Sequence, residues 1–238
     1  MPIRPSPCVN WFELPALATP LLDRAMAKVK VKICGITSWT DARRAVEAGA
    51  DFLGFNFYAR SPRYIEPRKA RKIVERLPET ISAVGVFVNE TEQKMLETAR
   101  AVKLDYLQLH GDESPATVAR LNRSLRVIKA VRVKPSFRPA QLSRFRSATA
   151  FLLDGFDRLR RGGTGKTFDW KLAQGAGLRG SVFLAGGLTP ENVGEAIRAA
   201  APYAVDVCSG VETAPGRKDP ALLKALMIAV RAAQKRKP

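Results

Sequence analysis

The sequence alternates between two kinds of segment along nearly its whole length. Short runs rich in apolar and β-branched residues are each followed by a stretch with apolar residues at helical spacing. We expect strands at 29–33, 52–57, 82–88, 106–109, 127–133, 150–153, 182–185 and 204–207. Strict alternation predicts parallel strands joined by crossover helices. Eight such units favour a closed (β/α)₈ barrel, an α/β fold, over an open sheet.

The helical stretches between these strands predict a single domain. They are expected at 41–48, 68–77, 92–102, 115–121, 139–145, 170–173, 191–200 and 220–233, the fifth and sixth being the least regular. Ser114-Pro115 and Thr189-Pro190 each place a capping hydroxyl ahead of proline, which is favoured at the first helical position. Because no linker or low-complexity segment separates the units, we expect one barrel domain over residues 28–238.

The first 27 residues do not follow this pattern. Five prolines between positions 2 and 20 break any regular element, and with Glu13 they interrupt the apolar stretch that a signal peptide needs. Met26 stands just before the first expected strand. We therefore expect residues 1–27 to be a flexible extension, or the product of an upstream start codon chosen in error.

Composition excludes several classes of protein. Hydrophobic residues make up 46% of the chain, enough for a sizeable core, so the chain is not disordered. No run of 18 apolar residues predicts a membrane-spanning helix. The cysteines, Cys8, Cys34 and Cys208, are odd in number and widely spaced, which supports neither a zinc site nor a disulfide framework. A reducing cytoplasm is the expected compartment.

The chain carries a formal net charge of +18, and residues 120–153 contain no acidic residue. This segment is either a solvated basic face or an RNA-binding surface. Its aromatic residues are only Phe137, Phe145 and Phe151, whereas stacking platforms for nucleic acid need more, and no RRM or KH signature is present. We favour the solvated face, expect neither a nucleic-acid nor a membrane partner, and expect the charge to aid solubility and steer an anionic substrate.

Reactive side chains gather where the expected strands end. In a barrel of this type the C-terminal strand ends form the active site. The first strand ends in Cys34, the segment after the second carries Arg63, the fourth ends in His110, and the sixth in Asp154. Each alone has a structural interpretation, such as a buried small hydrophobe or a helix cap. Together they indicate an acid–base site, with a thiolate in a basic surrounding and a carboxyl group suited to general-acid work.

Two glycine turns after the last two strands are typical of phosphate binding. They are Gly186-Gly187 and Ser209-Gly210. Glycine lets backbone N–H groups approach an anion closely, and a following helix N-terminus adds a positive dipole. The loops after these strands are also the usual phosphate position in this fold. The alternative is that the glycines only make tight turns.

A further glycine-rich segment at 162–167 ends like a P-loop. Arg160 stands where the first P-loop glycine belongs, so the pattern fails. We interpret the segment as a mobile loop over the site, with an ordinary exposed turn as the alternative.

The motifs at the strand ends resemble those of the phosphoribosylanthranilate isomerase family. They lie at 31–37 (VKICGIT), 48–51, 54–58, 61–64, 85–89, 107–112 (LQLHGD), 153–154, 162–170, 184–188 and 206–212 (DVCSGVE). The resemblance runs from about residue 29 to residue 226. It implies an Amadori rearrangement of N-(5-phosphoribosyl)anthranilate to 1-(2-carboxyphenylamino)-1-deoxyribulose 5-phosphate, a step of tryptophan biosynthesis. It implies no metal and no cofactor.

The resemblance also implies a role for each candidate residue. Asp154 would be the general acid that protonates the ribose ring oxygen, and Cys34 the general base that removes the C2 proton. Arg63 would bind the anthranilate carboxylate, for which a guanidinium fork is apt. His110 and Asp206 would line the site. The phosphorylated end of the small-molecule substrate would be held by Gly186, Gly187, Ser209 and Gly210.

One residue departs from the family, and two other functions are alternatives. Cys208 stands where the family usually has serine; because the exchange is nearly isosteric, we expect the phosphate site to persist. A sister isomerase of histidine biosynthesis would carry an aspartate in place of Cys34, so Cys34 argues against that function. Weak side activity of this chain on the histidine-pathway substrate is an alternative that the sequence does not exclude. A non-catalytic, basic RNA-binding barrel is the alternative from another class. The sequence is compatible with a monomer and with a homodimer.

Overall fold

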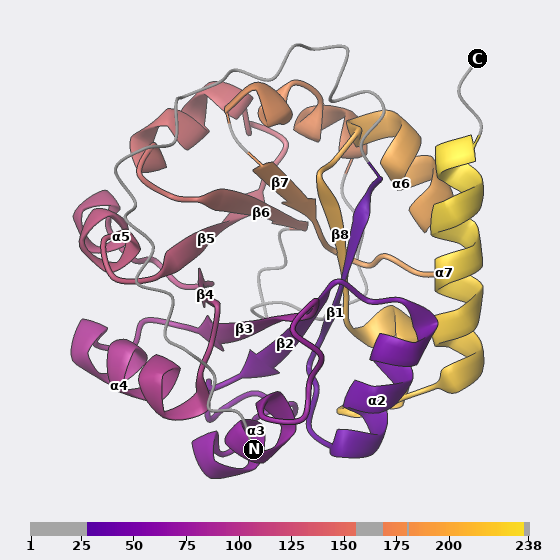
Figure 1. Ribbon diagram of the computed structural model, residues 1–238. Helices are drawn as coiled ribbons and strands as arrows, with labels where there is room; N and C mark the ends of the chain where they lie inside the picture. Colours follow the sequence, from indigo (N-terminus) through magenta and orange to yellow (C-terminus); the bar gives the residue numbers. More distant parts are fainter. Residues whose placement is uncertain (1–27, 156–168, 180, 236–238) are drawn as a thin grey trace.

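The computed structural model describes residues 28–155, 169–179 and 181–235. Within them, eight parallel strands close into a barrel in chain order, with β1 paired to both β2 and β8. Helices surround the ring of strands (Figure 1). The (β/α)₈ barrel predicted from the alternation is therefore confirmed. The expected extension at 1–27 and the glycine-rich segment at 162–167 lie outside the described residues.

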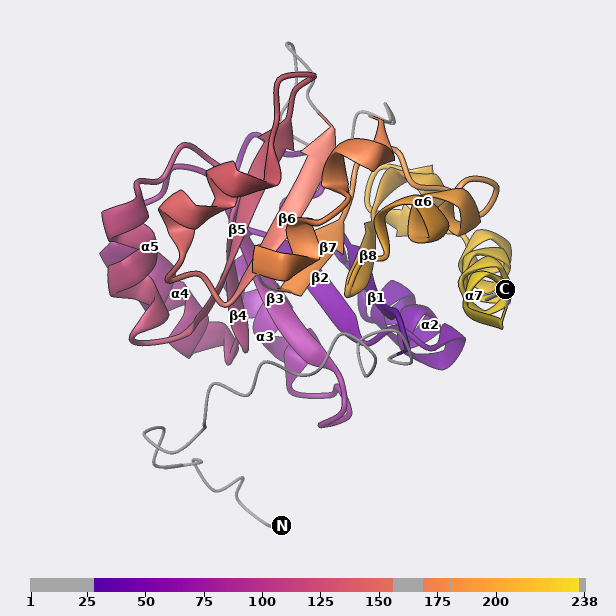
Figure 2. The ribbon, with the colours of Figure 1, turned by 90° about the horizontal axis from the view of Figure 1, so that it is seen from above.

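All eight expected strands are present, with ends that differ from the prediction by at most two residues. They are β1 (Lys30–Cys34), β2 (Phe52–Asn56), β3 (Ser82–Phe87), β4 (Tyr106–Leu109), β5 (Arg126–Val133), β6 (Ala150–Gly155), β7 (Ser181–Leu184) and β8 (Ala204–Val207). Figure 2 shows the strands side by side, with the helices packed outside them. A two-stranded hairpin that the sequence did not predict, β9 (Glu212–Ala214) and β10 (Arg217–Lys218), follows β8.

The helices agree with the prediction less closely than the strands do. The α-helices are α2 (Trp39–Ala48), α3 (Pro67–Val74), α4 (Glu92–Val102), α5 (Pro115–Asn122), α6 (Val193–Ala200) and α7 (Pro220–Lys235). The two least regular stretches are 3₁₀ helices, η1 (Pro139–Phe145) and η2 (Trp170–Ala173). Two further 3₁₀ helices were not predicted: η3 (Ala176–Arg179) and η4 (Ser209–Val211). Short segments with weak periodicity commonly take this tighter form. Among the described helices, none is both long and apolar enough to cross a membrane.

Of the two predicted helix starts, one is confirmed and one is wrong. Ser114 caps α5 by accepting a hydrogen bond from the Thr117 backbone N–H, with Pro115 in the first turn. By contrast, Thr189-Pro190 does not begin α6, which starts at Val193 after Asn192. The Asn192 side chain instead accepts from the Thr189 N–H and donates to the Gly187 carbonyl, at 2.8 and 2.9 Å. These bonds fold residues 187–192 into a turn, so the helix begins later.

The barrel lumen changes in character along its axis. Near the N-terminal strand ends, Phe52 packs edge-on against Tyr106 and Phe183, with ring centroids 5.9 and 5.2 Å apart. Toward the C-terminal ends, the inward positions hold ionisable side chains, among them the buried Lys32 and Asp206. Because side chains alternate between the two faces of a strand, the residues between these positions face the helices and form the larger apolar core. The apolar lower layer thus closes the barrel below a polar site.

Candidate active site

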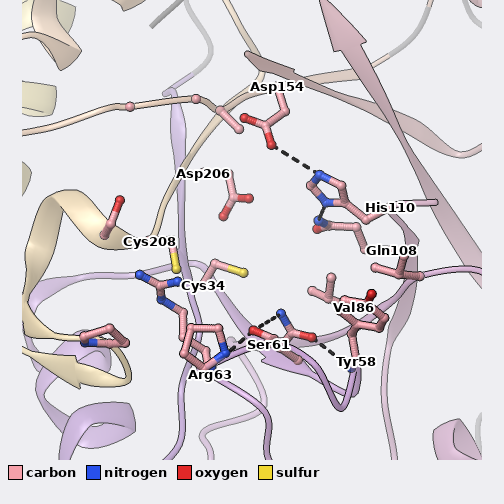
Figure 3. A pocket seen from close by; sticks show the side chains of 18 of the residues that line it. Cys34, Tyr58, Ser61, Arg63, Val86, Gln108, His110, Asp154, Asp206 and Cys208 are labelled. Atoms are coloured by element: carbon pink, nitrogen blue, oxygen red, sulfur yellow. Dashed lines mark hydrogen bonds and ion pairs between the residues drawn. The ribbon is translucent and has the colours of Figure 1, made fainter. Parts of the chain in front are cut away.

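A cavity of about 710 Å³ opens among the C-terminal strand ends (Figure 3). This volume is typical of a small-molecule site, and this end of the barrel is where the chemistry of the fold takes place. Eight of the nine candidate residues line it: Cys34, Arg63, His110, Asp154, Gly186, Gly187, Asp206 and Ser209. The topology therefore brings together side chains that lie up to 175 residues apart in the chain, from Cys34 to Ser209.

Gly210 is the one candidate that does not line the cavity. A Cβ atom at this position would collide with the carbonyl oxygen of Leu188. Gly186 is similarly confined, because its φ is +87° and a Cβ there would come within 2.6 Å of the Gly155 backbone nitrogen. Gly210 therefore lets the loops after β7 and β8 meet at the cavity rim, whatever else it does.

On one side of the cavity, His110 links two other polar side chains. Its Nε2 atom lies 3.2 Å from Oδ2 of Asp154, and its Nδ1 atom lies 3.0 Å from Nε2 of Gln108. With the Gln108 amide donating to Nδ1, the ring carries its proton on Nε2 and donates it to Asp154. Asp154 is thereby oriented by a hydrogen-bond donor, and its exposed fraction is only 6%.

On the opposite side, a buried ammonium group lies below Cys34. The pairing of β1 with β8 places Lys32 beside Asp206, and Lys32 Nζ donates to Asp206 Oδ1 at 2.9 Å. Burial disfavours the charge on Lys32, but the charges of Asp206 and Cys34 outweigh it and raise the pKa of the ammonium group. A fully buried lysine of this kind is stable only when acidic groups face it.

The thiol of Cys34 is strongly acidified. A hydrogen bond from Cys208 holds its pKa well below the usual value, burial opposes this, and the charges of Lys32 and Lys218 add to the effect. The pKa of Asp206 is raised to about 7, first by burial and then by the negative charge of Cys34, while Lys32 opposes the shift. One ammonium group thus faces two acidic groups, and ionisation of one disfavours ionisation of the other.

A charged network connects Arg63 to this side of the site. Arg63 Nε and Nη2 donate to the Glu212 carboxylate, at 3.0 and 2.7 Å for the shorter contacts. Glu212 also accepts from Lys218 Nζ at 2.7 Å, and the same ammonium group donates to the backbone carbonyls of Cys34 and Cys208. Only part of the Arg63 fork is therefore left for a ligand.

Comparison with known proteins agrees with this geometry. A sequence profile described as N-(5'-phosphoribosyl)anthranilate (PRA) isomerase matches residues 31–229. The chain belongs to this isomerase family. A protein of Moorella thermoacetica named N-(5'-phosphoribosyl)anthranilate isomerase is 52% identical over 207 residues, which are 87% of this chain and 91% of that protein. The family's activity, isomerisation of phosphoribosylanthranilate in tryptophan biosynthesis, is the activity of this enzyme.

Solved structures of similar proteins show the same barrel. A dimeric phosphoribosylanthranilate isomerase of Thermotoga maritima, obtained as monomers, has a TM-score of 0.75 and 42% identity over 86% of this chain and 99% of its own. A phosphoribosylanthranilate isomerase in complex with reduced 1-(o-carboxyphenylamino)-1-deoxyribulose 5-phosphate has a TM-score of 0.74 and 41% identity, with the same coverage.

Sequence reasoning gave no role to several polar residues of this isomerase site, four of which contact predicted site residues. Lys32 could have been found, since a lysine at every-other spacing with Cys34 in an apolar strand must face the lumen. Gln108 lies in the family motif at 107–112, which also contains His110. Glu212 ends the motif at 206–212, which also contains Asp206. Lys218 carried no signal, because its position depends on the unpredicted β9–β10 hairpin. In the described part of the chain, no group of three His, Cys, Asp or Glu side chains is placed to hold a metal ion.

Proposed function

We propose that Asp154 and Cys34 carry out the isomerisation as a general acid and a general base. The observation that supports these roles best is their placement on β6 and β1, on opposite sides of one cavity (Figure 3). A sugar bound between them would expose its ring oxygen to the carboxyl group and its C2 hydrogen to the thiolate. Each group also has a partner suited to its role, His110 for the acid and Lys32 for the base.

The reaction then follows from two proton transfers. Asp154 donates a proton to the ribose ring oxygen while the anthranilate nitrogen forms a double bond to C1, which opens the ring to an iminium ion. The Cys34 thiolate removes the C2 proton. The electron pair of that C–H bond forms the C1=C2 double bond, and the pair of the C=N π bond neutralises the nitrogen. The resulting enolamine tautomerises to the ketone. The Cys34 thiolate is the form of the thiol that accepts a proton, which is why its low pKa supports this role.

Two anion sites would hold the substrate at its ends. The N–H groups of Arg63 that Glu212 does not engage would bind the anthranilate carboxylate. The loops after β7 and β8, with Gly186, Gly187 and Ser209 on the cavity wall, would bind the phosphate. A relative that binds a ligand with a carboxyphenyl group at one end and a phosphate at the other supports this division.

Gln108 would bind a sugar hydroxyl. Its side chain is 1% exposed and lines the cavity, and its Oε1 atom has no hydrogen-bond partner among the described residues. A buried acceptor of this kind costs free energy unless a ligand satisfies it. A substrate hydroxyl is the donor that the reaction supplies.

Residues 28–238 would form the catalytic domain. The matched family region begins at residue 31, which supports placing the extension outside it. A chain that starts at Met26 should therefore turn over substrate as fast as the full chain.

A monomer and a homodimer both remain candidates, because the Thermotoga maritima relative is described in both forms. Light scattering during size-exclusion chromatography gives the molar mass of the protein and distinguishes the monomer from the homodimer.

The residue roles are tested by following the loss of substrate anthranilate fluorescence with the purified chain and two variants. Cys34→Ala and Asp154→Ala should each lower kcat by about 10²–10⁴-fold, the usual contribution of a positioned acid or base. Unchanged circular dichroism would show that the variants fold. Turnover near the parent rate in either folded variant would overturn that residue's role. A folded parent without turnover would redirect the test to the histidine-pathway substrate and then to RNA.

A further inference from the structure

Two thiols stand next to each other at the ends of neighbouring strands. The pairing of β1 with β8 ends with Ile33 beside Val207, and the next residues along the chain are Cys34 and Cys208. Both line the cavity, and Figure 3 shows their sulfur atoms close together. The pKa of each thiol is shifted first by the other thiol, as expected for neighbouring side chains.

The strand pairing one position before these thiols, Ile33 with Val207, has the spacing that a disulfide needs. Adjacent strands lie roughly 4.8 Å apart, and disulfide-linked residues have Cα atoms about 4.4–6.8 Å apart. The Lys218 ammonium group donates to the carbonyl oxygens of both Cys34 and Cys208, which ties the two chain segments to a single atom. We therefore expect rotation of the two side chains to bring the sulfurs into bonding distance.

The environment also favours oxidation. Thiolates, not thiols, attack peroxides, and the thiolate of Cys34 is stabilised first by Cys208 and then by Lys32. The cavity gives a small oxidant access to both sulfurs, and Cys208 is only half-buried. A reactive cysteine with a second thiol beside it is the arrangement in which a first oxidation product is resolved into a disulfide.

We infer that Cys34 and Cys208 form a site of reversible oxidative modification, at which a peroxide converts the two thiols into a disulfide. The Cys34 thiolate attacks one peroxide oxygen, the O–O bond breaks, and a sulfenic acid and hydroxide form. The Cys208 sulfur then attacks the Cys34 sulfur; the S–S bond forms, the S–O bond breaks, and water leaves with the Cys208 proton. In sum, two thiols and one hydrogen peroxide give one disulfide and two waters.

The consequence for turnover rests on the proposed function. A disulfide has no thiolate to accept the C2 proton, so the oxidised enzyme would be inactive until a dithiol reduces it. With serine at position 208, the residue that the family usually has there, no second thiol is available. Cys34 would then proceed from sulfenic to sulfinic acid, which a dithiol does not reverse.

The test uses the full chain carrying Cys8→Ser, which removes the third thiol, beside the same chain with Cys208→Ser added. Each is treated with hydrogen peroxide and compared with its own untreated sample. The first should lose the mass of two hydrogen atoms, yield a linked Cys34–Cys208 peptide, and lose at least about tenfold in turnover, which dithiothreitol restores. The Cys208→Ser chain should instead gain oxygen on Cys34, and dithiothreitol should restore little of its turnover.

The outcomes separate this site from the catalytic assignment. Oxygen added to Cys34 while Cys208 stays a free thiol would overturn the modification site. So would equal recovery of both chains in dithiothreitol. A linked peptide with undiminished turnover would support the modification site and would overturn the role of Cys34 as the base.

Discussion

Two buried lysine–glutamate pairs lie at the barrel mouth, one beside each half of the site. Lys218 pairs with Glu212 behind the base, and Lys129 pairs with Glu113 behind the acid; both N–O distances are 2.7 Å. Each ammonium group also donates to two backbone carbonyls. Lys218 holds those of the two thiol residues, and Lys129 holds those on either side of His110, at 3.2 and 2.8 Å.

The two pairs differ in what their charges reach. The Lys218 charge lowers the pKa of Cys34. Glu212 accepts hydrogen bonds from both Lys218 and Arg63. Neither pair lines the cavity, and Glu113 accepts from the backbone N–H groups of Asn89 and Gly111 rather than from a cavity-lining side chain. A lysine–glutamate pair therefore lowers the pKa of the Cys34 thiol on the base side, whereas on the acid side it fixes the loop that carries His110.

Removing each ammonium group separately tests whether the two pairs have different roles. Lys129→Met should lower the free energy of unfolding by about 3–5 kcal/mol, because it leaves the buried Glu113 carboxylate without a cation. Lys218→Met should lower it less, because Glu212 keeps its ion pair with Arg63. Only Lys218→Met should also slow the alkylation of Cys34 by iodoacetamide at neutral pH. Urea denaturation and alkylation rates measure the two effects. Equal slowing of alkylation in both variants would contradict the distinction.

Paired variants supply the matched control for this prediction. Adding Glu113→Gln to Lys129→Met removes the unpaired charge and should recover most of the stability, with turnover near that of the parent. Adding Glu212→Gln to Lys218→Met should recover neither stability nor turnover, since the largely buried Arg63 then loses its carboxylate partner. Recovery of turnover in both double variants would show that the two pairs have the same role.

Asp206 gives the base side a dependence on pH. Its pKa is raised from 3.8 to about 7 in the folded protein, first by burial. A raised pKa means that the folded state binds the proton more tightly, so the stability that this group contributes is present below pH 3.8 and is lost as the pH rises to about 7. The loss is at most about 4 kcal/mol. Asp206→Asn should remove this slope from urea unfolding measured across that range; an unchanged slope would contradict the assignment.

On the acid side, the hydrogen bond from His110 should matter for turnover more than for stability. His110→Leu removes the donor that faces Asp154. Since a hydrogen bond to a charged group contributes about 1.5–3 kcal/mol, kcat should fall roughly 10–100-fold. The steady-state fluorescence assay measures this. An unchanged kcat with a raised KM would assign His110 to substrate binding only.

The smallest expected effect concerns Arg63. Arg63→Lys keeps the charge but cannot reach Glu212 with two nitrogens and a ligand carboxylate at once. KM should rise about tenfold, with kcat changed much less. A fall in kcat at constant KM would place Arg63 with the reacting atoms rather than with the carboxylate.

Sequence alone predicted the barrel and eight residues of the cavity wall, and it failed elsewhere for identifiable reasons. Alternation fixes a strand's position and its inward residues, so Cys34, His110 and Asp154 could be placed on one rim. The charged partners depend on pairing between distant segments: Lys32 meets Asp206 only because β1 closes on β8. The start of α6 was mistaken because Asn192 binds the backbone of the preceding loop, which no local propensity reveals.

The division of labour between the two sides is tested most directly by a substrate carrying deuterium at C2. The kinetic isotope effect on turnover is compared between Cys34→Ser, which weakens the base, and Asp154→Asn, which removes the acid. We expect a larger isotope effect in Cys34→Ser, because removal of the C2 proton then limits the rate, whereas ring opening limits it in Asp154→Asn. A larger effect in Asp154→Asn, or equal effects in both, would contradict the assignment of the base to Cys34 and of the acid to Asp154.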